Sequence, residues 1–356
     1  MKKTILTYSI ILILTACSKS SSQPDPEPPV NPPTAADTSL KKDLPFPAGA
    51  AVNVNLLKTK EAYRSLVIKE YNSLTPENAM KIGALHPAKD TYTWTDADYL
   101  VSFAQQNSQR VHGHTLVWHQ SLPDWITNFV GDSAAWESLL KTHIQTVVTH
   151  FKGKVASWDV VNEAINDDGT LRNSIWRQKL GDDYIARSFQ YAHDADPDAL
   201  LFYNDYGHEY GVTKRTAILN LVNNLKTRGI PIHGIGLQMH TRYTQADNNL
   251  ANAINSAAAT GLKVHISELD IAMNPDNTAN LVFTAALAEQ QKQKYLFISK
   301  TFNAISKAQQ YGLTTWNVTD ADSWIPSTYN RNDWPLLFDS NYKRKPAYYG
   351  VLLGVQ

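Results

Sequence analysis

The chain has 356 residues, of which 43% are hydrophobic and 19% are charged, and its formal net charge is zero. This length accommodates one large domain with a substantial core, or two average domains. A zero charge balance gives no reason to expect a nucleic-acid partner, which would require a clustered basic surface.

The first 17 residues have the pattern of a secretory signal. Lys2 and Lys3 precede an apolar stretch over residues 5–14 that is too short to span a bilayer as a helix. The stretch ends in LTAC at residues 14–17, which resembles a bacterial lipoprotein cleavage box. The resemblance implies a secreted lipoprotein whose lipidated first residue is Cys17, anchored in the outer membrane on its periplasmic or its cell-surface face. The alternative is an ordinary signal peptide that contains a cysteine.

Residues 18–40 predict an extended linker. The segment is rich in proline and serine and has few large apolar side chains. Such a composition cannot bury enough surface to offset the entropy lost on ordering. At about 3.1 Å per residue, it would hold a domain up to roughly 70 Å from a membrane. Cys17 is the only cysteine, so no disulfide can form within the chain.

From residue 41 onward, short apolar runs alternate with longer stretches of helical spacing. The runs predict eight strands, at residues 51–54, 70–75, 110–117, 157–161, 200–203, 234–238, 263–267 and 313–316. Apolar residues recur on one helical face over 136–148, and Asp132 or Ser133 is suited to cap that helix. Three glycines precede strands where a left-handed helix end is expected: Gly229, Gly261 and Gly312.

Strands that alternate with helices predict parallel pairing and right-handed crossovers. Eight such units over residues 41–356 favour a single catalytic domain with the α/β fold of a (β/α)8 TIM barrel. The alternative is an open doubly wound sheet. That fold usually carries a glycine-rich phosphate turn after its first strand, and the sequence has none there.

Polar side chains that follow the strands of such a barrel face the active site. In this chain they are carboxylates, amides, histidines and tryptophans, which suit the binding of hydroxyl groups and stacking on sugar rings. Glu163 and Glu268 follow the fourth and seventh predicted strands and would face each other across the barrel mouth. A retaining glycosidase needs two carboxyl groups about 5–5.5 Å apart, one as nucleophile and one as acid/base.

Six motifs then give a specific resemblance. They are TPENAMK at 75–81, HGHTLVWH at 112–119, WDVVNEA at 158–164, LQMH at 237–240, SELDIAM at 267–273 and the pair Trp316 and Trp324. Together, and in this order, they resemble glycoside hydrolase family 10, the family of endo-β-1,4-xylanases with the (β/α)8 fold. The resemblance runs from the region of residue 45 to the C-terminus.

The resemblance implies roles for the matching residues. Glu163 resembles the acid/base (proton donor) and Glu268 the nucleophile. Asn162 would hydrogen-bond the 2-hydroxyl of the sugar that is cleaved. The residues expected to support the two carboxyl groups are Asn162, Gln238, His240 and Asp270, of which the last two would orient Glu268 and keep it ionised. The residues expected to bind substrate are Glu77, Asn78, Lys81, His114, Trp118, Gln120, Asn204, Tyr206, Trp316 and Trp324.

The implied reaction is the hydrolysis of internal β-1,4 bonds of xylan with retention of configuration. Glu268 would attack the anomeric carbon while Glu163 protonates the leaving oxygen, and water activated by Glu163 would release the glycosyl-enzyme. The implied partners are xylan and xylo-oligosaccharides, together with a membrane through the lipid anchor. We expect a monomer without a cofactor and without a catalytic metal, since no HExxH motif is present. A structural calcium stays open.

Two positions depart from the family pattern. Ala79 stands where a second glutamate is frequent, and Gln120-Ser121 follow His119 where a glutamine is common two positions on. The second departure leaves open which residue makes that polar contact, and with it some discrimination between xylose and glucose. A β-1,4-glucanase or cellulase on the same barrel is therefore the alternative enzyme. A non-catalytic glycan-binding lipoprotein is the alternative from another class, and the presence of both glutamates speaks against it.

Other residues have plainer readings. His112 is expected to pack rather than to catalyse, and His114 or His240 could also be buried core histidines. Asp205 fits a loop cap as well as a site residue, and His119 is undecided. Core or helix packing is expected for five tryptophans: Trp94, Trp125, Trp136, Trp158 and Trp176.

Overall fold

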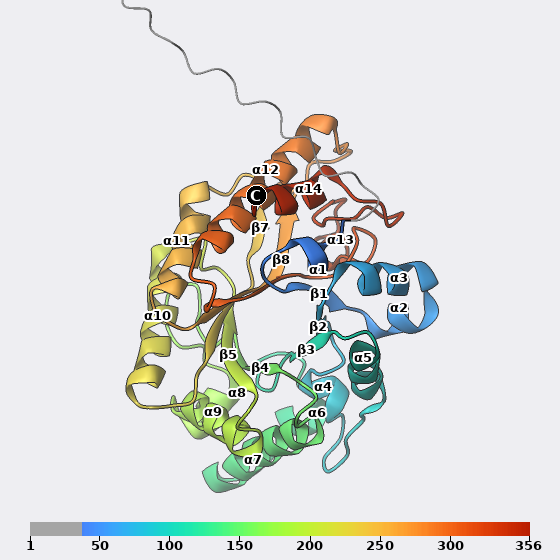
Figure 1. Cartoon of the computed structure of the whole chain (residues 1–356). Coiled ribbons are helices and arrows are strands. Elements are labelled where there is room, and N and C mark those ends of the chain that lie inside the picture. The colour runs from blue at the N-terminus through green and yellow to red at the C-terminus, as the bar shows by residue number, and fades with distance from the viewer. Residues whose placement is uncertain (1–37) are drawn as a thin grey trace, which may run out of the picture. The chain divides into compact units, whose positions relative to one another are not determined.

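A computed structural model of the protein describes residues 38–356. These residues form a closed barrel of parallel strands at the centre with helices outside it (Figure 1). The barrel strands are β1 (Ala48–Val52), β2 (Ser73–Pro76), β3 (Arg110–Gly113), β4 (Ser157–Asn162), β5 (Leu200–Asp205), β6 (Gly234–Leu237), β8 (Lys263–Ala272) and β9 (Gln310–Thr315). Pairing of β9 with β1 closes the ring, which confirms the predicted (β/α)8 fold.

The helices lie between and after the strands. They are α1 (Leu40–Asp43), α2 (Val54–Thr59), α3 (Glu61–Glu70), α4 (Ile82–Leu85), α5 (Thr95–Gln106), α6 (Asp124–Thr127), α7 (Ser133–His150), α8 (Ile175–Leu180), α9 (Tyr184–Ala195), α10 (Val212–Thr227), α11 (Asp247–Ala258), α12 (Ala285–Ala304), α13 (Trp324–Tyr329) and α14 (Pro346–Leu353). The predicted helix start is confirmed, because the side chain of Asp132 caps α7 by accepting from the backbone N–H of Ala135.

Several details differ from the sequence expectation. The first strand was predicted at residues 51–54 but spans Ala48–Val52, and Val54 already belongs to α2. Residue 70 still belongs to α3, so the second strand begins only at Ser73. The third strand ends at Gly113 rather than at residue 117. A short ninth strand, β7 (His240–Arg242), pairs in parallel with the end of β8 and was not predicted.

A further difference concerns a glycine. Gly229 and Gly261 have the expected positive φ, of +71° and +78°, beyond the ends of α10 and α11. Gly312 instead lies inside β9. A Cβ atom there would meet the guanidinium of Arg110 at 2.9 Å and the carbonyl of Pro47 at 3.0 Å. The glycine is therefore required by close packing within the barrel and not by a helix end.

Aromatic and histidine side chains fill the barrel interior below the mouth. His112 is fully buried, and its Nδ1 lies 2.6 Å from the hydroxyl of Ser157. Its ring also contacts the rings of Phe202, His265 and Tyr311. The expectation that His112 packs is confirmed. The expectation for the five tryptophans is also confirmed, since Trp136, Trp158 and Trp176 are fully buried and Trp94 and Trp125 pack against the core.

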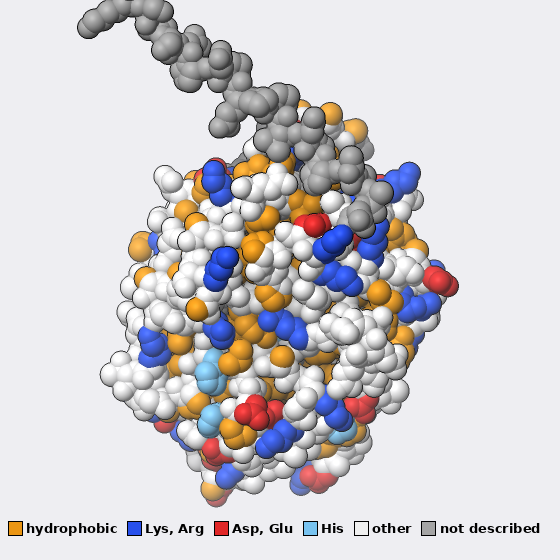
Figure 2. All heavy atoms as spheres, viewed as in Figure 1, with side chains coloured by type: hydrophobic (Ala, Val, Ile, Leu, Met, Phe, Trp, Pro, Cys, Tyr) orange, Lys and Arg blue, Asp and Glu red, His pale blue; other side chains and the backbone are white. Residues whose placement is uncertain are grey.

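The fold begins slightly before the predicted domain boundary. Leu40 is buried and donates its backbone N–H to the carboxylate of Glu70, although residues 38–40 were assigned to the linker. The predicted signal segment with Cys17, and the rest of the predicted linker, lie outside the described residues. Within residues 38–356, none of the helices has the length and apolar character needed to cross a bilayer. On the face in Figure 2, basic and acidic side chains are scattered among uncharged ones.

Candidate active site

A cleft of about 700 Å³ opens where the barrel strands end. It is lined by Glu77, Asn78, Lys81, His114, Trp118, His119, Gln120, Asn162, Glu163, Arg172, Tyr206, Tyr210, Gln238, His240, Glu268, Trp316, Trp324, Thr328 and Tyr329. Of the predicted catalytic, supporting and substrate-binding residues, only Asn204 and Asp270 are missing from this wall. Segments far apart in the sequence are therefore brought together by the barrel, as its geometry requires.

The backbone around Glu163 is held in an unusual conformation. Glu163 directly follows β4 and has a φ of +58°, in the left-handed region that non-glycine residues rarely adopt. Its N–H donates to the carbonyl of Asn204 at 2.9 Å, and its carbonyl accepts from Arg172 Nε at 2.8 Å. These two bonds fix the conformation. Such strain is typical of functional sites, where surrounding contacts hold a side chain in place.

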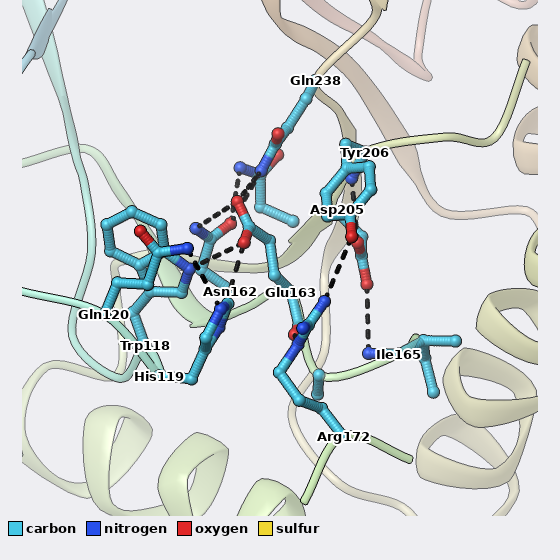
Figure 3. Close-up of polar contacts among 12 residues, drawn as sticks. Trp118, His119, Gln120, Asn162, Glu163, Ile165, Arg172, Asp205, Tyr206 and Gln238 are labelled. Carbon is cyan, nitrogen blue, oxygen red and sulfur yellow. Dashed lines mark hydrogen bonds and ion pairs between the residues drawn. The ribbon is translucent and has the colours of Figure 1, made fainter. Parts of the chain in front are cut away.

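Two neutral donors hold the two oxygens of the Glu163 carboxyl group (Figure 3). Trp118 Nε1 donates to Oε2 and Gln238 Nε2 donates to Oε1, each at 2.9 Å. The side-chain amide of Asn162 lies beside the same group, within hydrogen-bonding distance of the amides of Asn204 and Gln238. His119 Nδ1 lies 3.9 Å from Oε2, and burial lowers the pKa of this histidine. The carboxyl group is thus fixed in position without a cation in direct contact.

Glu268 is held differently. It lies within β8, between two residues where the register with β9 shifts, and such irregularities re-aim side chains next to active sites. Asn204 Nδ2 donates to Glu268 Oε1 at 2.7 Å, and His240 Nε2 lies 3.1 Å from Oε2. Burial by itself raises the pKa of Glu268, but hydrogen bonding to His240 and the charges of His114 and His240 outweigh it. The pKa consequently falls below its ordinary value.

His240 connects two carboxylates. Its Nε2 faces Glu268, and its Nδ1 lies 2.7 Å from Asp270 Oδ2. Only the protonated ring has two N–H donors for two acceptors. Burial lowers the pKa of His240, yet the charge and hydrogen bond of Asp270, with those of Glu268, raise it well above the ordinary value. Trp324 Nε1 also donates to Asp270 Oδ2 at 2.7 Å. Asp270, at the far end of this series of hydrogen bonds from Glu268, is thereby fixed in position.

The position of Asn204 corrects one prediction. This residue was expected to bind substrate, but its side chain is fully buried and is not part of the cleft wall. Its Nδ2 donates to Glu268, and its Oδ1 accepts from the hydroxyl of Ser267 at 2.6 Å. Asn204 therefore positions Glu268 from below.

The residues after β2 form one wall of the cleft. Lys81 Nζ donates to Asn78 Oδ1 at 2.9 Å and lies 5.2 Å from the centre of the Trp118 ring. Burial lowers the pKa of Lys81, while the charges of Glu268, Glu77 and Glu163 oppose that shift. Glu77 accepts from the side chain of Asn53 at 3.2 Å. The wall thus combines a cation, a carboxylate and an amide, which suits sugar hydroxyl groups.

Aromatic rings form further parts of the wall. Trp316 packs edge-on against His114, with ring centres 5.2 Å apart, and Trp324 packs against His240 at 4.9 Å. His114 is itself fixed by Asp159, whose Oδ2 lies 2.9 Å from His114 Nδ1. At the exposed rim, Gln120 Nε2 lies 3.2 Å from His119 Nε2. Tyr206 also reaches the cleft, where its hydroxyl accepts from Arg172 Nη2 at 3.2 Å.

Several wall residues were not predicted. Arg172 lies in the loop after β4, and Tyr210, Thr328 and Tyr329 lie beyond the ends of strands, so that no strand-end rule selects them. Asp205 is fully buried beneath the site, where it pairs with Lys214 at 3.1 Å. Burial raises the pKa of Asp205 to about 6. This residue is therefore more than a loop cap, but it does not reach the cleft.

Residues 38–356 contain no group of three or more histidine, cysteine or acidic side chains arranged to hold a metal ion. The described cleft brings together two carboxyl groups, those of Glu163 and Glu268, with their hydrogen-bond donors. One carboxyl group is buried against a cation, and the other is held by neutral donors in the same cleft.

Comparison with known proteins agrees with this arrangement. Residues 37–353 match the protein family described as "Glycosyl hydrolase family 10". An endo-1,4-beta-xylanase from Geobacillus stearothermophilus is 42% identical over 86% of this chain and 95% of its own length. The crystal structure of xylanase 10B from Thermotoga petrophila in complex with xylobiose has a TM-score of 0.84 and 36% identity, and covers 90% of this chain and 98% of that one.

Other relatives are much longer. The exoglucanase XynX of Acetivibrio thermocellus is 38% identical over 88% of the present chain, but the match spans only 29% of XynX. It likewise spans 31% of endo-1,4-beta-xylanase C from Paenibacillus barcinonensis, at 38% identity over 89% of this chain. The family match itself covers nearly all the described residues and every part of the cleft. On this match and these identities, the chain belongs to glycosyl hydrolase family 10.

Proposed function

We propose that the protein is a retaining endo-β-1,4-xylanase that hydrolyses internal bonds of xylan. The observation that carries the proposal is the unequal environment of two carboxyl groups in one cleft. Glu268 is kept ionised by His240 and Asn204, whereas Glu163 contacts only neutral donors at hydrogen-bond distance. A two-step glycosidase requires this division, with one carboxylate as nucleophile and one group that exchanges a proton.

The mechanism follows from these contacts. Glu268, as carboxylate, attacks the anomeric carbon and forms a covalent ester, while Glu163 transfers its proton to the leaving glycosidic oxygen. Glu163, now a carboxylate, takes a proton from water, and the oxygen of that water displaces Glu268. The negative charge of Glu268 disappears in the ester, and this removes a repulsion that otherwise disfavours ionised Glu163. Asn162 lines the cleft together with both groups, where it would hydrogen-bond the 2-hydroxyl of the sugar that is cleaved.

The test is hydrolysis of linear xylan, followed by reducing-sugar release and by NMR of the first anomer formed. We expect the β-anomer first, because two inversions give retention. Glu268→Ala should abolish turnover on every substrate. Glu163→Ala should lose xylan hydrolysis but keep a first step on aryl glycosides whose leaving group needs no proton. Binding of xylan without any release of sugar would instead identify a glycan-binding protein.

A β-1,4-glucanase is the second candidate, because one relative of this chain bears the name exoglucanase. A glucose unit carries a hydroxymethyl group that xylose lacks, and we expect Trp324 and the residues near Gln120, which line the cleft, to crowd it. Rates on xylan and carboxymethylcellulose should be compared side by side. Faster release from the cellulose derivative would favour the glucanase over the xylanase.

We further propose that the protein is a bacterial lipoprotein whose first mature residue is Cys17. The motif at residues 14–17 and the proline-rich stretch after it support a lipid anchor with a tether. Mass spectrometry of the mature N-terminus and membrane fractionation test this proposal. Wild type should carry the lipid, and Cys17→Ser should lose it and leave the membrane fraction. We propose a monomeric catalytic domain, to be tested by light scattering of residues 38–356.

A further inference from the structure

A second hollow of about 300 Å³ adjoins the cleft, and we call it the side pocket. It shares four wall residues with the cleft: Tyr210, His240, Trp324 and Tyr329. The side pocket therefore begins at the residues that flank Glu268 and extends outward, past β7 and α13. The two hollows are therefore adjacent, as expected if a branch on a sugar bound in the cleft is to reach the side pocket.

Two tyrosine–arginine pairs flank the side pocket. The Arg242 guanidinium lies 5.6 Å from the centre of the Tyr210 ring, and that of Arg331 lies 4.7 Å from the centre of the Tyr329 ring. Both tyrosines are exposed, Tyr210 at 45% and Tyr329 at 50%. The hydroxyl of Tyr210 donates to the carbonyl of His240 at 3.0 Å, which fixes this ring at the entrance.

Of the two arginines in the wall of the side pocket, one forms an ion pair with a carboxylate of the described residues and the other does not. Arg331 is held by Asp333 at 3.1 Å and donates to the carbonyl of Pro275. Arg242, at the exposed end of β7, has no carboxylate within ion-pair distance among residues 38–356. The one acidic wall residue, Asp270, is bonded to His240 and Trp324. The pocket thus offers a free guanidinium beside exposed aromatic rings.

We propose that the side pocket binds a uronic-acid branch of the polysaccharide, with Arg242 pairing with the branch carboxylate. This inference rests on the proposed xylanase function and deepens it by naming an acidic, branched xylan as the substrate class. A guanidinium matches a carboxylate in a two-bond geometry. The faces of Tyr210 and Tyr329 offer apolar contact to the branch sugar. A neutral branch would use the same rings but would gain nothing from the arginine.

The experiment compares two polymers that differ only in charge. One is a linear-backbone xylan with uronic-acid branches, and the other is the same polymer after its carboxyl groups have been reduced to hydroxymethyl groups. The ratio of kcat/KM on the acidic polymer to kcat/KM on the reduced polymer is measured for wild type, Arg242→Gln and Arg242→Glu. Lys300→Gln, which removes one exposed cation on α12, is the matched control.

For wild type we expect a ratio above one that declines at 1 M salt, since an exposed ion pair is screened. Arg242→Gln should lower the ratio about two- to fivefold, the effect expected for the loss of an exposed ion pair. Arg242→Glu should lower it further, and Lys300→Gln should leave it unchanged. An equal ratio in wild type and Arg242→Gln would overturn the side-pocket proposal while xylanase activity stands. Failure of wild type to cleave either polymer would overturn the proposed function and this inference with it.

Discussion

The indole N–H of Trp118 offers a sharp test of how Glu163 is held. Trp118→Phe removes the donor 2.9 Å from Glu163 Oε2 but keeps most of the ring that walls the cleft. A hydrogen bond to a charged group contributes about 1.5–3 kcal/mol. Each 1.36 kcal/mol is about tenfold in rate, so the loss is at most about 10- to 150-fold. Gln238 still holds Oε1, which places the expected loss in the lower part of that range.

The assay separates orientation of the acid from binding. On xylo-oligosaccharides, whose leaving group needs a proton, kcat/KM should fall by about tenfold or more. On an aryl xylobioside with a very good leaving group it should fall by less than about threefold, because no proton is required there. Trp324→Phe is the matched control, since it removes the same kind of donor from Asp270 on the nucleophile side. That variant should slow both substrates alike. Equal losses on both substrates in Trp118→Phe would refute the assignment and leave Trp118 as a binding wall.

Three further predictions concern the nucleophile and the fold. His240→Asn removes the cation that lowers the pKa of Glu268, so the pKa of Glu268 should rise. The carboxylate then takes up its proton at a higher pH. The acidic limb of the kcat/KM–pH profile should therefore move to higher pH. Lys345→Met removes the ammonium that lies 2.8 Å from the buried carboxylate of Asp320. The free energy of unfolding, measured in urea, should fall by about 3–5 kcal/mol, and the double variant with Asp320→Asn should regain part of it. Gly234→Ala would place a Cβ 2.0 Å from the Phe202 ring inside the barrel and should lower the free energy of unfolding by about 1–3 kcal/mol. Gly211→Ala, which has open space around it, is the control and should lower it by less than about 1 kcal/mol.

The barrel was predictable because its strands are buried on both sides and appear as short apolar runs. The boundaries of the strands were not predictable from the sequence, since a buried residue at the end of a helix resembles one at the start of a strand. Val67 and Tyr71 are both in the core, yet the first lies in α3 and the second precedes β2. β7 has three residues and only its middle one is buried, so it carries no periodic signal.

Most of the cleft was predictable because motif residues stand directly after strands. How deep each side chain lies below the barrel mouth was not predictable, as Asn204 shows. Asn204 and Tyr206 are two positions apart at the end of β5, but β5 extends to Asp205 and carries the first of them below the mouth. Arg242 shows the opposite limit, because its importance depends on which charges surround it in space. No pattern in the sequence states that it lacks a carboxylate partner.

The contrast between the two glutamates follows from what each must do during one turnover. Glu163 has to carry a proton, release it and take up another, so a fixed cation in contact with it would favour one state. Its two donors are neutral, and an amide such as that of Gln238 can turn its oxygen toward a protonated carboxyl group. Glu268 never needs a proton. The hydrogen-bonded series Trp324, Asp270 and His240 places a partly buried cation beside it, and Asp270 balances the charge of that cation. Replacing Gln238 by Glu would bring a third carboxyl group against Glu163. Its repulsion should slow the second step, in which Glu163 acts as a carboxylate base, by disfavouring that ionised state. Accumulation of the glycosyl-enzyme in burst kinetics would reveal this delay, and its absence would show that the neutrality of Gln238 is not required.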